Sequence, residues 1–370
     1  MKNPIDLAAE AAAFADQYQM LPQGSTVLCA VSGGKDSMAL LSVLQTLAPE
    51  RNLMIHAAHF NHQLRGEESQ RDEDFVSKWC ADHNIPLTIG SGDVAQAAQE
   101  QGKGIEETAR AMRYGFLTET AQEVGAEKIA TAHNADDNAE TVLLHLVRGS
   151  GLDGLTGIPP VRGILIRPLL GVPRIDIEVY LAQEDIPHVE DSSNQDTKFA
   201  RNRIRQAILP VMKDLNPAFV STLSANLVHL REDRELLHDM AESVTCEALV
   251  EDGKVSIQAA SLADLPHPIA ARAVKQLLAK AGRFQVSAVH IDQIIELATG
   301  ETPSANLNLP EGLFAWREYE NLVICPAEAI PPSFSLRLLT GPGVFALDNG
   351  WQIEIKETTC PEIPAQEEYE

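Results

Sequence analysis

Cysteine and positive charge are both scarce in this sequence, and each shortage argues against a class of protein. The five cysteines lie far apart in 370 residues, and none belongs to a Cys-x-x-Cys pair. This spacing argues against a disulfide framework, a zinc ribbon and an iron–sulfur cluster. Lysine and arginine total 29 against 53 acidic residues, so the formal net charge is −24. Such a balance is unusual in a protein that binds nucleic acid, because basic side chains make most contacts to phosphate.

Long apolar runs are also missing. No stretch of about 18 apolar residues occurs, and the N-terminus lacks a basic segment followed by an apolar one, so the sequence predicts neither a membrane span nor a signal peptide. We therefore expect a cytoplasmic enzyme that makes no contact with a membrane. The chain is long enough for two domains and a small third.

The most informative segment of the chain, residues 32–37, reads Ser-Gly-Gly-Lys-Asp-Ser. It follows a short apolar run typical of a buried parallel strand and precedes an amphipathic helix that Asp36 or Ser37 is placed to cap. Adjacent glycines allow positive φ and carry no Cβ, so consecutive N–H groups can converge on an anion at the helix N-terminus. A strand-to-helix turn that needs only small residues is the simpler alternative. The combination of strand, cap and helix favours a phosphate or pyrophosphate site, although the spacing is not that of a Walker A loop.

A second polar cluster follows a strand predicted at 128–132. His133, Asp136, Asp137 and Glu140 stand just before and within the first turns of the next predicted helix. Asp137 and Glu140 are three apart and Asp136 and Glu140 are four apart, so each pair shares a helix face. Stabilisation by the helix dipole is enough to explain one carboxylate near the helix N-terminus. It does not explain a cluster of three acids and a histidine. In an ATP site, carboxylates can hold Mg²⁺ or orient an amine, and the histidine can contact phosphate or adenine.

Arg110 and Arg113 lie on one side of a helix predicted over 105–124. Either guanidinium could neutralise the charge that develops as pyrophosphate leaves. For Arg110, a solvated ion pair with Glu106 or Glu107 is the better interpretation.

Strand and helix patterns alternate over residues 1–200, which predicts an α/β fold with a doubly wound parallel sheet and a ligand site at the carboxyl ends of its strands. Pro217 disfavours helix at residue 216, so we place a domain boundary there. The predicted domains are a catalytic domain at 1–216, a small α+β domain at 217–327 and a short C-terminal β segment at 328–370. Two windows, 154–175 and 197–213, contain basic residues and no acid, which indicates a local gathering of positive charge unless it arose by chance.

Residues 32–37 resemble the pyrophosphate loop of the N-type ATP pyrophosphatases, or PP-loop enzymes, whose fold is adenine nucleotide alpha hydrolase-like. Other motifs narrow this resemblance to the tRNA(Ile)-lysidine synthases, because their order and spacing match through the first domain. These motifs lie at 133–141, 148–152, 166–170, 190–194 and 201–205. The second domain is similar to the family's middle domain, and the last segment looks like a shortened form of its final domain.

The resemblance implies a ligase reaction. Members of this family use ATP to adenylate the C2 oxygen of the wobble cytidine in the CAU anticodon of tRNA(Ile). The ε-amino group of L-lysine then displaces AMP, which gives lysidine, AMP and pyrophosphate. The implied co-substrate is ATP with Mg²⁺, and the implied partners are tRNA(Ile) and L-lysine. The oligomeric state stays open, with a homodimer as one possibility.

The resemblance also assigns roles to particular residues. It implies that ATP is bound by Ser32, Gly33, Gly34, Lys35, Asp36, Ser37, His133 and Asp136. It implies that the lysine and reaction site is formed by Asp36, Arg113, Asp137, Glu140 and Arg205, that Asp36 helps to bind Mg²⁺, and that Asn202 is a weaker candidate for the nucleotide.

Three other functions were weighed against the sequence. A tRNA thiolase of the same superfamily would generally need paired cysteine motifs, and a glutamine-dependent synthetase would need a glutaminase-like Cys/His domain; the sequence shows neither. A regulatory module that binds ATP without turnover is opposed only by Asp137 and Glu140.

Overall fold

The protein is described by a computed structural model in which the chain forms two compact units, Met1–Leu236 and Leu237–Glu370. The residues that the structure describes are 5–64, 66–190, 200–251, 253–282, 286–300, 305–326, 341–346 and 352–356. Most of the motif expected at 190–194 therefore lies outside the described residues. Each unit is considered by itself.

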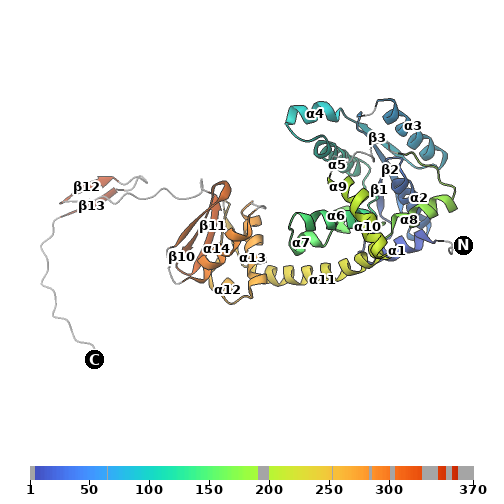
Figure 1. Cartoon of the computed structure of the whole chain (residues 1–370). Coiled ribbons are helices and arrows are strands. Elements are labelled where there is room, and N and C mark those ends of the chain that lie inside the picture. The colour runs from blue at the N-terminus through green and yellow to red at the C-terminus, as the bar shows by residue number, and fades with distance from the viewer. Residues whose placement is uncertain are drawn as a thin grey trace. The chain divides into compact units, whose positions relative to one another are not determined.

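The first unit is built on a six-stranded sheet with the order β3-β2-β1-β4-β6-β5 (Figure 1). Its strands are β1 (Thr26–Ala30), β2 (Met54–Asn61), β3 (Leu87–Ser91), β4 (Lys128–Ala130), β5 (Val161–Arg162) and β6 (Leu165–Ile166). All neighbours pair in parallel except β5, which forms an antiparallel hairpin with β6 at the sheet edge. The predicted parallel α/β sheet is confirmed, and the short edge strand β5 was not anticipated.

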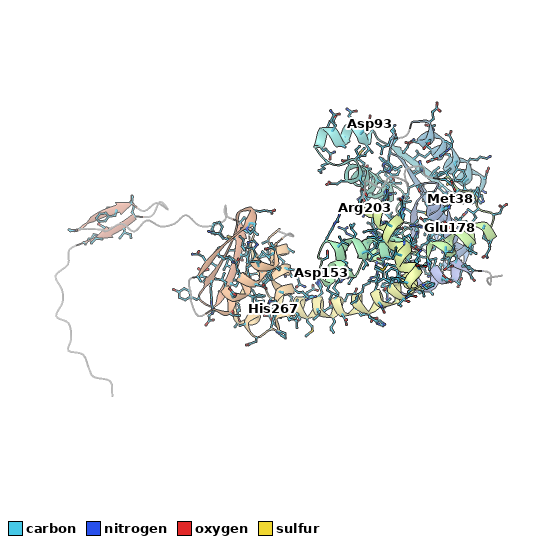
Figure 2. The ribbon with its side chains drawn as sticks, viewed as in Figure 1. Met38, Asp93, Asp153, Glu178, Arg203 and His267 are labelled. Atoms are coloured by element: carbon cyan, nitrogen blue, oxygen red, sulfur yellow. The ribbon has the colours of Figure 1, made fainter. Side chains whose placement is uncertain are left out.

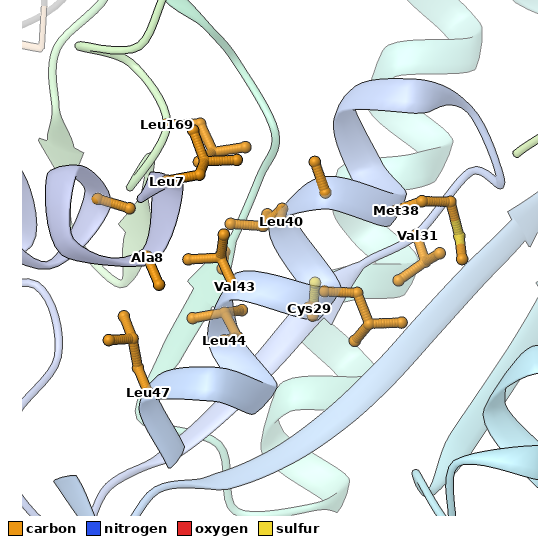
Figure 3. Packing of buried hydrophobic residues seen from close by; sticks show 14 of the residues in the cluster. Leu7, Ala8, Cys29, Val31, Met38, Leu40, Val43, Leu44, Leu47 and Leu169 are labelled. Atoms are coloured by element: carbon orange, nitrogen blue, oxygen red, sulfur yellow. The ribbon is translucent and has the colours of Figure 1, made fainter. Parts of the chain in front are cut away.

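Helices cover both faces of this sheet because successive residues of β1 point to opposite sides. Val27 and Cys29 pack into the larger core, which contains apolar residues of α1, α2, α3 and α8 (Figure 3). Leu28 packs into a smaller core with Leu117 and other residues of α5. The helices of this unit are α1 (Leu7–Gln17), α2 (Lys35–Arg51), α3 (Glu67–Asp82), α4 (Val94–Gln101), α5 (Ile105–Glu123), α6 (Ala135–Val147), α7 (Leu152–Leu155), α8 (Arg174–Gln183), α9 (Ala200–Arg203), the π-helix η2 (Ile204–Ile208) and α10 (Leu209–Leu215).

A long helix, α11 (Phe219–Thr245), begins two residues after Pro217. The boundary predicted after residue 216 coincides with the break between α10 and α11. The two compact units, however, separate within α11, after Leu236. Among the helices described, none combines the length and apolar character that a membrane span requires.

The second unit has a five-stranded antiparallel sheet with the order β7-β8-β11-β10-β9. Its strands are β7 (Leu249–Glu251), β8 (Lys254–Gln258), β9 (Asn306–Leu309), β10 (Leu313–Glu318) and β11 (Asn321–Pro326), and its helices are α12 (Ala260–Ala263), α13 (His267–Lys280), α14 (Ala288–Thr299) and the 3₁₀ helix η3 (Pro310–Gly312). Helices α13 and α14 supply most of the apolar residues packed on the sheet. The predicted small α+β domain is thus present. Strands β12 (Gly343–Ala346) and β13 (Gln352–Ile355) form a separate antiparallel pair, as expected of a short β segment.

Candidate active site

The predicted phosphate loop joins β1 to α2. Helix α2 begins at Lys35 with Gly34 as its N-cap, two or three residues earlier than expected, so neither Asp36 nor Ser37 is the cap. The N-cap residue gives no side-chain hydrogen bond, and the N–H groups of the first turn of a helix are suited to an anion. Gly33 has a φ of +88°, and a Cβ there would lie 2.9 Å from Val189 Cγ2. Gly33 therefore meets a backbone requirement, whereas Gly34 has an ordinary extended conformation with φ −75° and room for a Cβ, so the positive φ allowed at both glycines is used only at Gly33.

The loop lines a cavity of about 950 Å³ at the carboxyl ends of β1, β2 and β4. From β1 the sheet extends in one direction through β2 and β3, and β4 is then added on the other side of β1. A doubly wound sheet binds its ligand at such a reversal of strand order. The residues of the predicted site that line this cavity are Ser32, Gly34, Lys35, Asp36, Ser37, Arg113, His133, Asp137 and Arg205. Glu178 on α8, labelled in Figure 2, also lines it and pairs with Lys35 at 3.3 Å.

Two buried acids on α6 hold three arginines, and we call these five residues the paired cluster. Asp137 Oδ1 accepts hydrogen bonds from Arg174 Nη2 at 3.0 Å and Arg205 Nη2 at 3.1 Å. Glu140, whose side chain is fully buried, accepts from Arg205 Nε at 2.6 Å and Arg201 Nε at 3.1 Å. Three guanidinium groups thus share two carboxylates, so every arginine of the cluster has an acidic partner although the five charges sum to +1.

Local structure explains how these residues meet. Asn134 and Asp137 form a reciprocal capping box that begins α6 and fixes the orientation of the Asp137 carboxylate. Arg205 lies in the π-helical turn η2, a feature that often occurs at functional sites, and Arg201 precedes it by one helical turn. Arg174 is the first residue of α8.

Asp36 lies beside the paired cluster without a guanidinium bonded to it. Its Oδ1 accepts a hydrogen bond from Asn134 Nδ2 at 3.1 Å. Burial, and then repulsion by Asp137, raise the pKa of Asp36 to about 6, although Arg174 and Arg205 oppose this shift. A carboxylate with incomplete compensation suits Mg²⁺, which commonly takes one or two carboxylates together with substrate phosphates. The described residues contain no group of three or more His, Cys, Asp or Glu that could hold a metal without a substrate.

Arg110 and Arg113 of α5 line the same cavity, and neither forms an ion pair with a described carboxylate. The guanidinium carbons of Arg110 and Arg113 stand 5.0 Å and 5.4 Å from the centroid of the Tyr114 ring. Arg167 is 3% exposed, and burial lowers its pKa and that of Arg113. Burial, and then Arg167 and three other arginines, lower the pKa of His133 to about 3, so its imidazole is neutral.

We call Arg110, Arg113, Arg167 and His133 the unpaired cluster. Within the described part of the chain, none of its arginines forms an ion pair. The pairing expected between Arg110 and Glu106 or Glu107 is therefore not found, because Arg110 lies over the ring of Tyr114 instead. Uncompensated positive charge in a cavity favours an anionic ligand.

Three residues of the predicted site do not line the cavity. Gly33 contributes backbone geometry, and Glu140 acts through its arginines. Asp136 instead joins three helices, because its carboxylate accepts from Arg174 N at 2.8 Å and Lys213 Nζ at 2.5 Å. This placement does not support direct contact between Asp136 and a nucleotide.

Two arginines of the paired cluster were missed from the sequence. Arg201 and Arg205 are four apart and share a helix face, which is a signal that could have identified Arg201. Arg174 gives no such signal, because the acids that it contacts precede it by more than thirty residues. The two acid-free windows do converge, since Arg174 comes from one and Arg201 and Arg205 from the other.

Comparison with known proteins agrees with this geometry. Residues 7–212 match the PP-loop domain family, and residues 258–323 match the TilS substrate binding domain. The tRNA(Ile)-lysidine synthase of Geobacter sulfurreducens is 34% identical over 366 residues, which is 97% of this chain and 78% of that protein. The enzyme of the same name from Geobacillus kaustophilus is 33% identical over 350 residues, covering 92% and 75%.

A shorter match has higher identity. The tRNA(Ile)-lysidine synthase of Thermotoga maritima is 47% identical over 198 residues, which is 54% of this chain and 48% of that protein. Among solved structures, a U34-tRNA thiolase, NcsA from Methanococcus maripaludis with its 4Fe–4S cluster, superposes with a TM-score of 0.50 at 17% identity, over 61% of this chain and 79% of that one. This likeness concerns the fold alone. Because the PP-loop domain match spans more than half of the chain and full-length relatives are more than 30% identical, the chain belongs to the tRNA(Ile)-lysidine synthase family of PP-loop enzymes.

Proposed function

We propose that this protein ligates L-lysine to C2 of the wobble cytidine in the CAU anticodon of tRNA(Ile), with ATP converted to AMP and pyrophosphate through an adenylated cytidine. Family membership supports the reaction. The observation that carries it is a single cavity whose walls include both the PP loop and the acids and arginines of α6, α8, α9 and η2.

The two halves of the reaction need different groups. The C2 oxygen of cytidine is a poor leaving group, so it must be activated before an amine can displace it. The N-terminus of α2 and the loop at 32–37 would bind the phosphates of ATP. Asp36 would hold Mg²⁺, which would supply charge stabilisation at the phosphates. Arg113, which forms no ion pair with a described carboxylate, would stabilise negative charge on the leaving group.

Lysine brings two amino groups and a carboxylate to the same cavity. Asp137 lines the cavity and Glu140 does not, so Asp137 is the acid of this pair that an amine can reach. Because both acids already hold arginines, their main task would be to orient Arg174, Arg201 and Arg205. Those guanidinium groups retain N–H donors for a carboxylate or a phosphate.

The decisive experiment is product analysis. The protein is incubated with ATP, Mg²⁺, labelled lysine and tRNA(Ile) bearing CAU, and the digested tRNA is searched for lysidine. A matched tRNA with uridine at the wobble position should take up no lysine. ATP binding without AMP formation or a modified nucleoside would favour a regulatory module and contradict the proposal.

Two further points rest on the resemblance. We propose that the enzyme acts in the cytoplasm, where fractionation would locate it, and that a homodimer is one possible form. Light scattering on purified protein measures the second point directly.

A further inference from the structure

Residues 156–160, between α7 and β5, are held by an unusual buried arginine, and we call them the clamp loop. Arg231 on α11 is 5% exposed and donates from Nε to Thr156 O at 3.2 Å and from Nη2 to Ile158 O at 3.1 Å. It forms no ion pair with any described carboxylate. Neighbouring Arg234 donates to Thr156 Oγ1 at 3.2 Å. This buried guanidinium therefore bonds two backbone carbonyls of one loop, in addition to a side-chain hydrogen bond with Tyr18.

The clamp loop contacts α6 on its other side. Ile158 N donates to Asn138 Oδ1 at 2.7 Å, and Asn138 is 2% exposed. Gly157 has a φ of +70°, and a Cβ there would lie 2.2 Å from the same Oδ1 atom. Asn138 directly follows Asp137 and is two residues from Glu140. The loop therefore fits closely against the helix turn that carries the acids of the paired cluster.

The clamp loop also contacts the unpaired cluster. Arg167 Nη1 donates to Pro159 O at 2.6 Å, and Arg167 N donates to Pro160 O at 3.1 Å. One five-residue loop is consequently bonded to α11, to α6 and to Arg167. An apolar side chain of similar size would avoid the desolvation of Arg231, so stability alone is a poor explanation for a charge at this position.

We propose that Arg231 is a positioning residue for lysidine formation: it holds the clamp loop against Asn138 and Arg167 and thereby sets the relative placement of the paired and unpaired clusters. The inference rests on the proposed function, because lysidine formation is the reaction that it would affect. The PP loop makes none of these contacts, so ATP binding should not depend on Arg231.

The first test compares three variants at neighbouring or identical positions. Arg231→Met keeps the length of the side chain and removes its donors, Arg231→Lys keeps one cationic donor group, and Glu232→Gln changes an exposed neighbour on the same helix. We expect Arg231→Met to lower kcat for lysine incorporation by about tenfold to 100-fold, as small misplacements of reacting groups do, with KM for ATP unchanged. Arg231→Lys should recover part of the loss, and Glu232→Gln should match the wild type.

The second test asks whether Arg231 and Asn138 act through the same loop. We expect Asn138→Ala to reproduce the loss in kcat, and the double variant Arg231→Met, Asn138→Ala to lose no more than about twofold beyond the worse single variant. Multiplicative losses would overturn the inference, as would a loss that only tracks the unfolded fraction in thermal melts. If Arg231→Met does not fold, a wild-type kcat in folded Asn138→Ala overturns it equally. A wild-type protein that forms no lysidine overturns this inference and the proposed function together, whereas an active wild type with an equally active Arg231→Met overturns the inference alone.

Discussion

The paired and unpaired clusters flank one cavity and are both rich in arginine, but their electrostatics differ. In the paired cluster, Asp137 and Glu140 accept hydrogen bonds from every guanidinium group. In the unpaired cluster, Arg167 is buried and Arg113 is partly buried, neither forms an ion pair with a described carboxylate, and His133 stays neutral. The first arrangement gives each arginine an acidic partner within the protein, so it can stabilise the fold and orient side chains. The second leaves its charge to be balanced by a bound anion, so it costs stability until the substrate arrives.

The sharpest test of this contrast is Glu140→Gln in the paired cluster. Removing one member of a buried charged network should cost about 3–5 kcal/mol in the free energy of unfolding, because guanidinium groups are left without their partner. Urea denaturation measures this loss. Glu178→Gln, which breaks the half-exposed pair with Lys35, is the control and should cost about 1 kcal/mol or less. An equal, small loss in both variants would contradict the description of a paired cluster.

In the unpaired cluster the same kind of change should act on catalysis instead. Arg113→Leu should lower the rate of AMP formation by about 100-fold to 1,000-fold, the usual consequence of removing a group that stabilises developing charge. Its free energy of unfolding should stay the same or rise, because an uncompensated buried charge is gone. Single-turnover kinetics and urea denaturation on the same preparation test both parts. A strongly destabilised Arg113→Leu would show that Arg113 has a partner in the fold.

Asp137→Asn tests whether the paired cluster serves lysine more than ATP. The change keeps the shape of the side chain and removes the charge that holds Arg174 and Arg205. A hydrogen bond to a charged group contributes about 1.5–3 kcal/mol, so lysine incorporation should fall about tenfold or more while ATP affinity changes little. Single-turnover incorporation and equilibrium ATP binding are the two measurements. Equal losses in both would refute this division of roles.

Because His133 is neutral in the folded protein, the free energy of unfolding depends on pH. Its folded pKa of about 3 is below the ordinary value of 6.5, so the unfolded chain binds the proton more readily between these values. The contribution of His133 is complete above pH 6.5 and is lost as the pH falls toward 3. At pH 5 the loss should be about 2 kcal/mol. Denaturation of the wild type and His133→Asn between pH 7 and pH 5 should show a shallower decline in the variant; parallel curves would contradict the assignment.

Asp36 should show the opposite dependence on pH. Its folded pKa of about 6 is above the ordinary value of 3.8, so its favourable contribution is complete below pH 3.8 and is lost as the pH rises through 6. Asp36→Asn should therefore be more stable than the wild type at pH 7, by about 3 kcal/mol, while AMP formation is lost. Thermal melts at pH 4 and pH 7 measure the difference. A variant less stable than the wild type at pH 7 would show that the carboxylate is compensated within the fold.

The sequence alone fixed those parts of the protein that depend on local pattern. The order of strands and helices, the PP loop and the acids at the start of α6 all follow from apolar periodicity, glycine and capping chemistry over a few residues. These features also carry the family resemblance. The position of Arg113 on a predicted helix suggested that it matters, whereas the role of Arg205 was implied by the family resemblance.

Only the tertiary structure decided how charges are shared. From the sequence, Asp137 and Glu140 are predicted to be a free pair of acids that could bind an amine. In the folded protein they are instead bonded to Arg174, Arg201 and Arg205 from distant segments. Asp136 has the same chemistry as Asp137 but points to Lys213 and the start of α8, because a helix directs neighbouring side chains to different faces. Arg231 gave no signal, since it bonds backbone carbonyls about seventy residues away and the side chain of Tyr18, which is more distant still along the sequence. Long-range pairing of this kind depends on how helices pack against one another. The spacing of residues along one helix does not predict that packing.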